Sequence, residues 1–192
     1  LKAVLSAKKY SEAKELVKQN LASMASDAER AKAYNYLVKL SMDAFNKESA
    51  KELEDQIKKT TTADKESMYK NAYNALTSAI ECYKYDQLPN AKGKVAPKFK
   101  GNASRVWAAR QQLVNAGQAA AQNNKADDVL KYWGAFLDTD AEPLFASIDA
   151  KQKEGEKEYI GQVALFAARY AYQAKDVARC EKYCDIAMTS EK

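Results

Sequence analysis

The chain contains no histidine, the side chain most often used as a general acid or base near neutral pH and the commonest ligand of transition metals. A Ser-His-Asp or Cys-His catalytic arrangement is therefore impossible within these 192 residues. Chemistry based on lysine, tyrosine or paired carboxylates stays open, but no carboxylate pair stands in the sequence context of a catalytic pocket. We therefore expect a protein that is not an enzyme and that uses neither a cofactor nor a metal ion.

Glycine and proline are also scarce, with six and three residues. Because these two residues most often interrupt helices, their scarcity favours helix over strand. Hydrophobic residues make up 46% of the chain and recur with a helical period, while charged residues make up 30%. The composition therefore predicts a folded, all-α protein and excludes a disordered one.

Cysteine occurs only at Cys82, Cys180 and Cys184, and an odd number argues against a disulfide framework. Cys180 and Cys184 lie one helical turn apart, which is a poor geometry for a mutual bridge. Two cysteines at this spacing could supply half of a metal site, but no matching pair occurs elsewhere. We therefore expect all three to be buried as small hydrophobic side chains.

Long apolar runs are missing too. The most apolar run, residues 163–168, stops at Arg169 and is far shorter than the ~18 residues that a membrane span needs. The net charge of +5 is only mildly basic, which is not the profile of a dedicated nucleic-acid-binding protein. Because helical sequence runs up to both ends, at Leu1 and Lys192, we expect this chain to be a fragment of a longer protein.

Two pairs of small-residue stripes dominate what the sequence does contain. Each stripe follows the spacing i, i+3 or i+4, i+7, which places its residues on one helical face. Two such faces separated by a short break predict a pair of closely packed antiparallel helices, over residues 104–138 and again over 155–189. The stripes are Leu113, Ala116, Gly117 and Ala120 with Val129, Trp133 and Phe136, then Ala164, Ala167, Ala168 and Ala171 with Cys180, Cys184 and Ala187.

The rest of the chain predicts further helices within one domain of residues 1–192. Residues 1–60 form the first helix pairs, beginning with a helical remnant at residues 1–7. A long helix ends near Phe45, Asn46 interrupts it, and a separate helix at 49–59 turns Leu53 and Ile57 inward. A long helix at 63–85, capped by Asp64, is expected to be unpaired, because a loop stands where its second helix should be. Residues 86–103 then form the one long irregular loop, giving about nine to ten helices in all.

These helix pairs resemble the tetratricopeptide repeat (TPR). Residues 10–13, "YSEA", look like the start of the motif's second helix, and Gly117 matches the small residue at the centre of its first helix. Val129 stands where alanine is usual, and no proline closes the final repeat. The resemblance implies a right-handed superhelix of antiparallel helix pairs that binds partners and performs no chemistry.

The segment "DQLPNAKGKVAPKF" at residues 86–99 is similar to a group of exported TPR proteins from Gram-negative gut anaerobes. That narrower resemblance implies a place in the periplasm or cell envelope, with the cytoplasm as the alternative.

A concave, polar groove lined by the first helix of each pair follows from the TPR resemblance. Amide side chains can pair with the backbone of an extended peptide, and Lys39 or Arg169 can bind a carboxylate. We therefore expect a scaffold that binds an unidentified protein or peptide, with an oligomeric state that the sequence does not specify. The groove residues are Lys32, Asn35, Lys39, Gln111, Gln118, Gln122, Gln162, Arg169 and Tyr172, with Leu165 beside them.

A second hypothesis rests on the loop with its flanks, residues 84–105, where basic residues are interleaved with aromatic ones within or beside this segment: Tyr83, Tyr85, Phe99 and Trp107. Such a segment can bind an acidic glycan or single-stranded nucleic acid through charge and stacking, although lysines also simply keep a loop soluble and nucleic acid is the less favoured partner. Val95 and Phe99 are expected to pin the loop to the helices. The basic residues are Lys92, Lys94, Lys98, Lys100 and Arg105.

Overall fold

Every regular element in residues 9–190, the part of the chain that the computed structural model describes, is helical, and this confirms the all-α prediction. The expected remnant at residues 1–7 lies outside the described residues. None of the described helices is long and apolar enough to span a membrane. The seven α-helices and two short 3-10 helices are α2 (Tyr10–Asn20), η1 (Leu21–Ser23), α3 (Asp27–Lys58), α4 (Lys65–Asp86), α5 (Asn102–Gln122), α6 (Ala126–Asp138), η2 (Pro143–Ser147), α7 (Ala150–Gln173) and α8 (Val177–Ser190).

The chain divides into two compact units, residues 1–109 (unit 1) and residues 110–192 (unit 2). The boundary falls inside α5, so one continuous helix begins in unit 1 and ends in unit 2. Each unit has buried apolar residues of its own.

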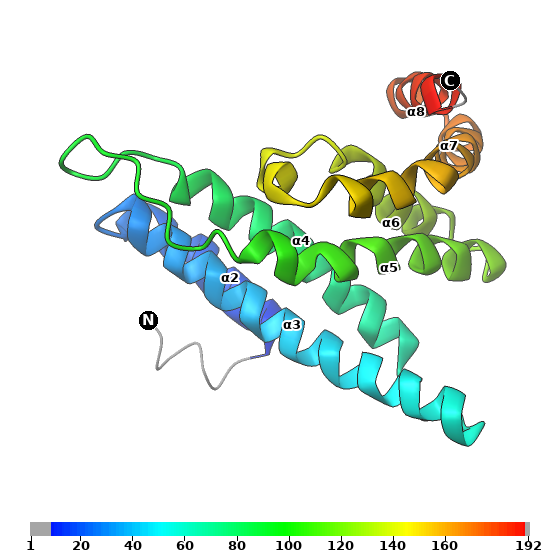
Figure 1. Cartoon of the computed structure of the whole chain (residues 1–192), viewed down its shortest axis with the longest axis horizontal. Helices are drawn as coiled ribbons and strands as arrows, with labels where there is room; N and C mark the ends of the chain where they lie inside the picture. Colours follow the sequence, from blue (N-terminus) through cyan, green and yellow to red (C-terminus); the bar gives the residue numbers. More distant parts are fainter. Residues whose placement is uncertain (1–8, 191–192) are drawn as a thin grey trace. The chain divides into compact units, whose positions relative to one another are not determined.

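Unit 1 is built on α3 and α4, which run antiparallel along each other, with α2 against α3 (Figure 1). Both long helices begin at side-chain caps: Ser26 Oγ accepts the N–H of Glu29, and the carboxylate of Asp64 accepts the N–H of Ser67. Asp64 therefore caps α4 as the sequence predicted. The helix expected at 63–85 is α4, and its packing partner is the preceding α3. The core of unit 1 includes Ala13, Val17, Leu37, Met68, Leu76 and Cys82.

α3 corrects one prediction, because Asn46 does not end it and the two expected helices are one. Asparagine costs a helix interior only a few tenths of a kcal/mol, and neither glycine nor proline follows it. The C-terminal half of α3 is also tied to the start of α4, since a carboxylate oxygen of Glu48 accepts the backbone N–H of Asp64 at 2.8 Å. Because α3 is one continuous helix, Glu48 and Asp55 lie on its buried face.

The predicted burial of Leu53 and Ile57 is wrong, because these side chains are 61% and 76% exposed. The stripe that faces α4 runs through Ser41, Phe45 and Glu48, and it reaches Asp55 two turns later. Leu53 and Ile57 fall on the opposite side of α3, so the apolar spacing that predicted their burial belonged to a helix with a different phase.

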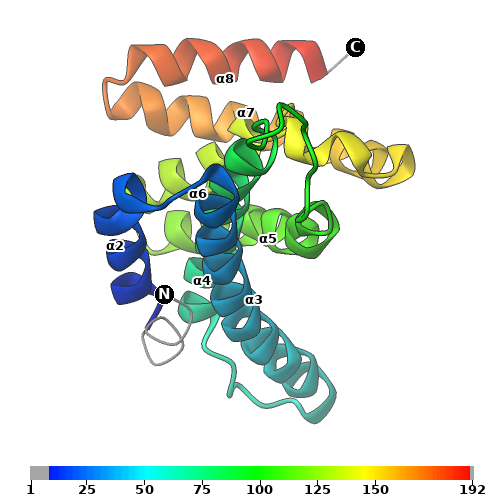
Figure 2. The ribbon, with the colours of Figure 1, turned by 90° about the vertical axis from the view of Figure 1, so that its left-hand side faces the viewer.

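Unit 2 contains the C-terminal part of α5 with α6, followed by α7 and α8. α6 lies against α5 through Trp133, whose indole Nε1 donates a hydrogen bond to the carbonyl oxygen of Val114 at 3.0 Å. α7 and α8 run antiparallel side by side (Figure 2). Asn124 and Lys175 close the turns after α5 and α7 with φ angles of 55° and 58°. Helices therefore occupy residues 104–138 and 155–189, the two ranges in which packed pairs were expected.

Candidate functional site

Unit 2 has a pocket of about 570 Å³ bounded by α5, α6 and α7, called here the unit 2 pocket. Twelve residues line it, and they fall into three chemical groups. The aromatic residues are Trp133, Tyr159, Phe166 and Tyr170; the polar residues are Gln118, Gln122, Gln162, Gln173 and Arg169; the aliphatic residues are Val114, Ala121 and Val163.

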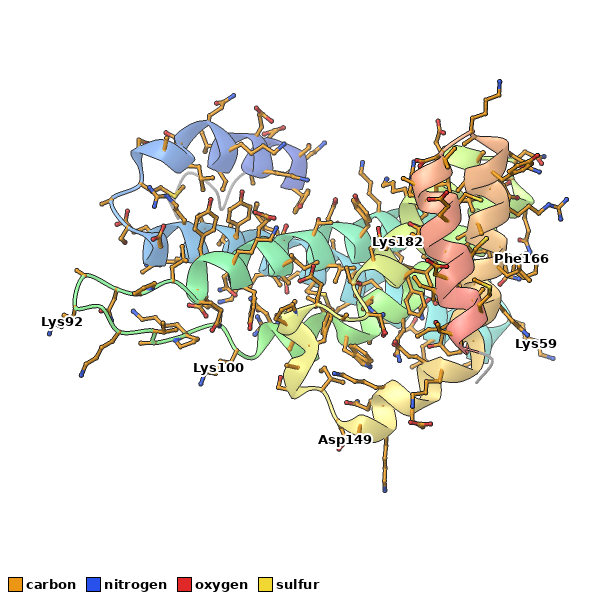
Figure 3. The ribbon with its side chains drawn as sticks, turned by 90° about the horizontal axis from the view of Figure 1, so that it is seen from above. Lys59, Lys92, Lys100, Asp149, Phe166 and Lys182 are labelled. Atoms are coloured by element: carbon orange, nitrogen blue, oxygen red, sulfur yellow. The ribbon has the colours of Figure 1, made fainter. Side chains whose placement is uncertain are left out.

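An aromatic cluster forms the apolar side of this pocket. Trp133 is only 6% exposed, and its ring centroid lies 6.1 Å from that of Phe166 and 6.1 Å from that of Tyr170, the latter edge-on. Phe166 itself is half exposed, and Figure 3 shows it on α7. The cluster therefore offers an apolar surface that solvent reaches mainly at Phe166.

Glutamine amides form the polar side. Gln118 and Gln122 lie one turn apart on α5, while Gln162 and Gln173 lie on α7, and all four side chains are exposed. Each amide can donate and accept hydrogen bonds at once, as a peptide backbone requires. Arg169 is the one charged residue among the described pocket residues, and within residues 9–190 it forms no hydrogen bond or ion pair.

A buried ion pair stands behind the pocket. Arg110 and Glu156 are 0% and 1% exposed, and the guanidinium donates a short hydrogen bond to a carboxylate oxygen of Glu156. Arg110 also donates to Thr139 Oγ1 at 3.0 Å and to the carbonyl of Phe136 at 3.0 Å, and it lies 4.4 Å from the Phe136 ring centroid. These bonds tie the start of α7 to α5 and α6.

The ion pair was missed by sequence analysis, because residues 154–158 alternate acidic residues with lysine as an exposed helix does. Its relation to the pocket runs through Tyr159, one turn beyond Glu156, which lines the pocket and stacks on Phe136 with ring centroids 5.9 Å apart. The buried pair thus holds the helix segment that carries one wall of the pocket.

The structure gathers four of the predicted groove residues, Gln118, Gln122, Gln162 and Arg169, around this pocket. Gln111 is half-buried on α5 and Tyr172 is 76% exposed on α7, and neither lines it. Lys32, Asn35 and Lys39 belong to α3 in unit 1. Both lysines are exposed, but Asn35 is 7% exposed, so its amide is not on the surface as the prediction required.

No match to this chain is found among protein-family models, curated proteins or solved structures.

The pocket residues outside the predicted groove include Trp133, Tyr159, Phe166, Tyr170 and Gln173. On α7 the expected stripe was Gln162, Leu165, Arg169 and Tyr172, whereas the pocket stripe is Gln162, Phe166, Arg169 and Gln173 at i, i+4, i+7 and i+11. The two stripes share Gln162 and Arg169 and differ by one residue at the other two positions. Leu165 is 59% exposed outside the pocket. Both stripes have helical spacing, so periodicity alone could not choose between them.

The loop between α4 and α5 is held by side-chain hydrogen bonds. The carboxylate of Asp86 accepts the backbone N–H groups of Lys98 and Phe99, and Asn90 Oδ1 accepts those of Lys92 and Lys94. The loop therefore has a defined backbone, which turns at Gly93 with a φ of 72°.

Phe99 packs on the core of unit 1 as predicted, whereas Val95 is 52% exposed and does not pin the loop. The four loop lysines are exposed, and within the described chain their ammonium groups form no ion pair. Figure 3 shows Lys92 and Lys100 pointing outward. Arg105 is also exposed, but its guanidinium donates to Asn102 Oδ1 at 2.8 Å.

The cysteines are all reduced, and they differ in environment. Cys82 is buried, and burial, followed by the nearby charge of Asp86, raises its pKa to about 12. Cys180 and Cys184 are half-buried on α8, where burial also raises the pKa of Cys180. Among the described residues no cluster of three or more cysteines and carboxylates could hold a metal ion.

Proposed function

We propose that this chain is a non-enzymatic scaffold that binds an extended peptide in the unit 2 pocket. The observation that carries the proposal is the pairing of exposed glutamine amides on two helices with an aromatic surface between them. The amides can satisfy the polar backbone of a peptide, and the aromatic cluster can bury one of its side chains.

A preformed site keeps the entropic cost of binding low on the protein's side. The amides project from helices, and α7 is fixed by the buried Arg110–Glu156 pair. The close approach of Trp133 to Gly117 supports the further proposal that α5 and α6 form a TPR-like pair, with a right-handed superhelix as the expected arrangement of the whole array.

Selection of a displayed random decapeptide library on the purified chain tests the function. Selected peptides are then made with a fluorescent label and titrated by anisotropy. Replacing Gln118 and Gln162 together by alanine should weaken binding by about tenfold or more, because each lost hydrogen bond contributes about 1 kcal/mol. Gln152→Ala, an exposed change on α7 outside the pocket, should leave the affinity unchanged. The proposal fails if no peptide is selected, or if the double variant binds the selected peptides normally.

Binding of an acidic polymer to the loop is a second candidate, favoured by the four exposed lysines on a backbone held by Asp86 and Asn90. Heparin, single-stranded DNA and a neutral glycan are the probes, each titrated at two salt concentrations. Since counterion release makes such binding weaken with salt, heparin or DNA should bind more tightly at the lower one.

A variant with alanine at all four loop lysines should lose this binding. Alanine at four exposed helix lysines, Lys18, Lys32, Lys39 and Lys70, removes the same charge elsewhere and is the matched control. Equal losses in the two variants would attribute binding to overall charge and reject the loop as a site.

A further inference from the structure

The unit 2 pocket contains two different subsites about one turn apart on α7. Phe166 is half exposed beside Trp133 and Tyr170, and three residues later comes the exposed Arg169. Residues at i and i+3 are neighbours on a helix surface, and their Cα atoms are separated by ~4.5 Å along the axis. An apolar contact and a cationic contact are thus offered side by side.

The charge of the pocket lining favours a negatively charged ligand. The polar side chains around Arg169 are neutral amides, and no carboxylate lies among the described lining residues. A guanidinium binds a carboxylate through two parallel hydrogen bonds that an amide or ammonium cannot match. The pocket therefore complements a negatively charged group and disfavours a positive one.

The dimensions suit a short extended chain. From Gln162 to Gln173 the pocket stripe follows α7 for ~16 Å, which an extended peptide covers with about five residues. On α5, Gln118 and Gln122 are separated by ~6 Å along the axis, close to the ~6.7 Å repeat of every second residue in an extended peptide. The two amides can therefore meet peptide groups that point the same way.

We infer that the occupant is an extended peptide segment in which an acidic side chain binds Arg169 and an aliphatic or aromatic side chain packs on Phe166. Since side chains alternate along an extended chain, the two ligand residues lie two positions apart. This inference rests on the proposed function and specifies its ligand.

A neutral glycan is the competing occupant, because sugars also use amides and aromatic rings. The burial of Trp133 favours the peptide, because this ring is only 6% exposed and presents no open face on which a sugar could stack.

Three synthetic decapeptides test the inference. They share one leucine and differ two positions later, where they carry glutamate, glutamine or lysine, and each is titrated by anisotropy. The glutamate peptide should bind about tenfold or more tightly than the lysine peptide, and this preference should shrink as salt screens the charges.

Arg169→Glu should reverse the order, so that the lysine peptide binds best, and Arg169→Gln should abolish the preference. Lys157→Glu makes the same change of charge on α7 outside the pocket and should keep the original order. Because Arg169 is exposed, neither variant should disturb the fold, which circular dichroism checks.

The possible failures are distinct. Equal binding of the three peptides, still lost when Gln118 and Gln162 become alanine, overturns the acidic ligand and leaves peptide binding intact. Absence of binding by every library-selected and synthetic peptide overturns the proposed function as well. Saturable binding of a neutral hexasaccharide that is lost in the glutamine variant and unaffected by Arg169→Glu overturns the peptide in favour of a glycan.

Discussion

Gly117 has no side chain, and this lets α5 and α6 approach each other closely. A β-carbon built on Gly117 would lie 2.3 Å from Cδ1 and 2.4 Å from Nε1 of Trp133. The indole cannot yield easily, since it is packed against Phe166 and Tyr170 and bonded to the carbonyl of Val114. The prediction that only a tiny side chain fits at Gly117 is confirmed, and the same contact positions one side of the pocket.

Gly117→Ala should therefore lower the free energy of unfolding by about 1–3 kcal/mol, the usual cost of overpacking. Gly155→Ala is the matched control, because nothing lies within 4 Å of its β-carbon position in α7. That change should raise stability by about 0.5–1 kcal/mol through the loss of glycine's backbone freedom. Urea denaturation followed by circular dichroism measures both, and equal effects would contradict the packing argument.

Arg110 and Glu156 show the opposite case, in which two large charged side chains are fully enclosed. Arg110→Met should destabilise unit 2 by about 3–5 kcal/mol, because it leaves the Glu156 carboxylate buried without its partner. Replacing both residues by methionine should recover much of that loss, since no buried charge then remains.

Arg179→Met provides the comparison, because Arg179 and Asp176 form a partly exposed pair at 2.6 Å. Its cost should stay below about 1 kcal/mol. Urea unfolding of the three variants checks the series. If the double variant is less stable than Arg110→Met, the unpaired charge of Glu156 is not the main cause of the loss, and the argument is contradicted.

At the scale of elements, the turn between α3 and α4 depends on one carboxylate. Asp55 accepts hydrogen bonds from the hydroxyls of Thr60 and Thr62 and from the backbone N–H groups of Thr62 and Ala63. These bonds lower the pKa of Asp55 from 3.8 to about 2, and the bond from the Thr60 hydroxyl has the largest effect. Burial acts in the opposite direction and is outweighed. A residue on the preceding helix therefore organises the threonine turn at residues 60–62.

This shift predicts how stability depends on pH. Because the folded pKa lies below the unfolded one, the contribution of Asp55 is present above about pH 4 and is lost as the pH falls from 3.8 towards 2. Melting temperatures between pH 6 and pH 2 at constant ionic strength should therefore fall most steeply in that range.

Asp55→Asn should lower the melting temperature near neutral pH and flatten its decline below pH 4. Asp43→Asn, an exposed change on the same helix, should leave the profile unaltered. An Asp55→Asn profile that still runs parallel to that of the unmodified chain would assign the acid sensitivity to other groups.

At the scale of the whole molecule, the thiols can report on the two units separately. Cys82 is 1% exposed in unit 1, where its thiol donates to the carbonyl of Ala31, while Cys180 and Cys184 are half-buried in unit 2. At pH 8 iodoacetamide should modify Cys180 and Cys184 first. Cys82 should react only when unit 1 opens. The thiolate is the nucleophile, and with a pKa of about 12 only a very small fraction of the Cys82 thiol is ionised at pH 8.

Peptide mass spectrometry over time measures this order. In low urea the modification of Cys82 should become faster as unit 1 unfolds. Circular dichroism monitors the unfolding. Rapid modification of Cys82 in the native protein would show that its burial is only transient.

Several elements were predictable because their signals are local. Asp64 caps α4 through a hydrogen bond to a residue three positions away, and the small-residue stripes around Gly117 and Ala168 lie within single helices. The buried face of α3 was not predictable, because Glu48 lies inward to accept the N–H of Asp64, sixteen residues further on. The pocket face of α7 was predicted at Gln162 and Arg169 and missed at Phe166 and Gln173, because one residue of shift turns a helical face by about 100°.

The sequence by itself determined that this protein is helical, that it has no histidine for catalysis, and where its small residues allow helices to approach. These properties follow from composition and from spacing within one helix. Only the tertiary structure decided which flank of α7 faces the pocket, that Glu156 is buried against Arg110, and that Leu53 and Ile57 are exposed. Each of these depends on the partner that a helix meets, and such contacts join residues that are far apart in the chain.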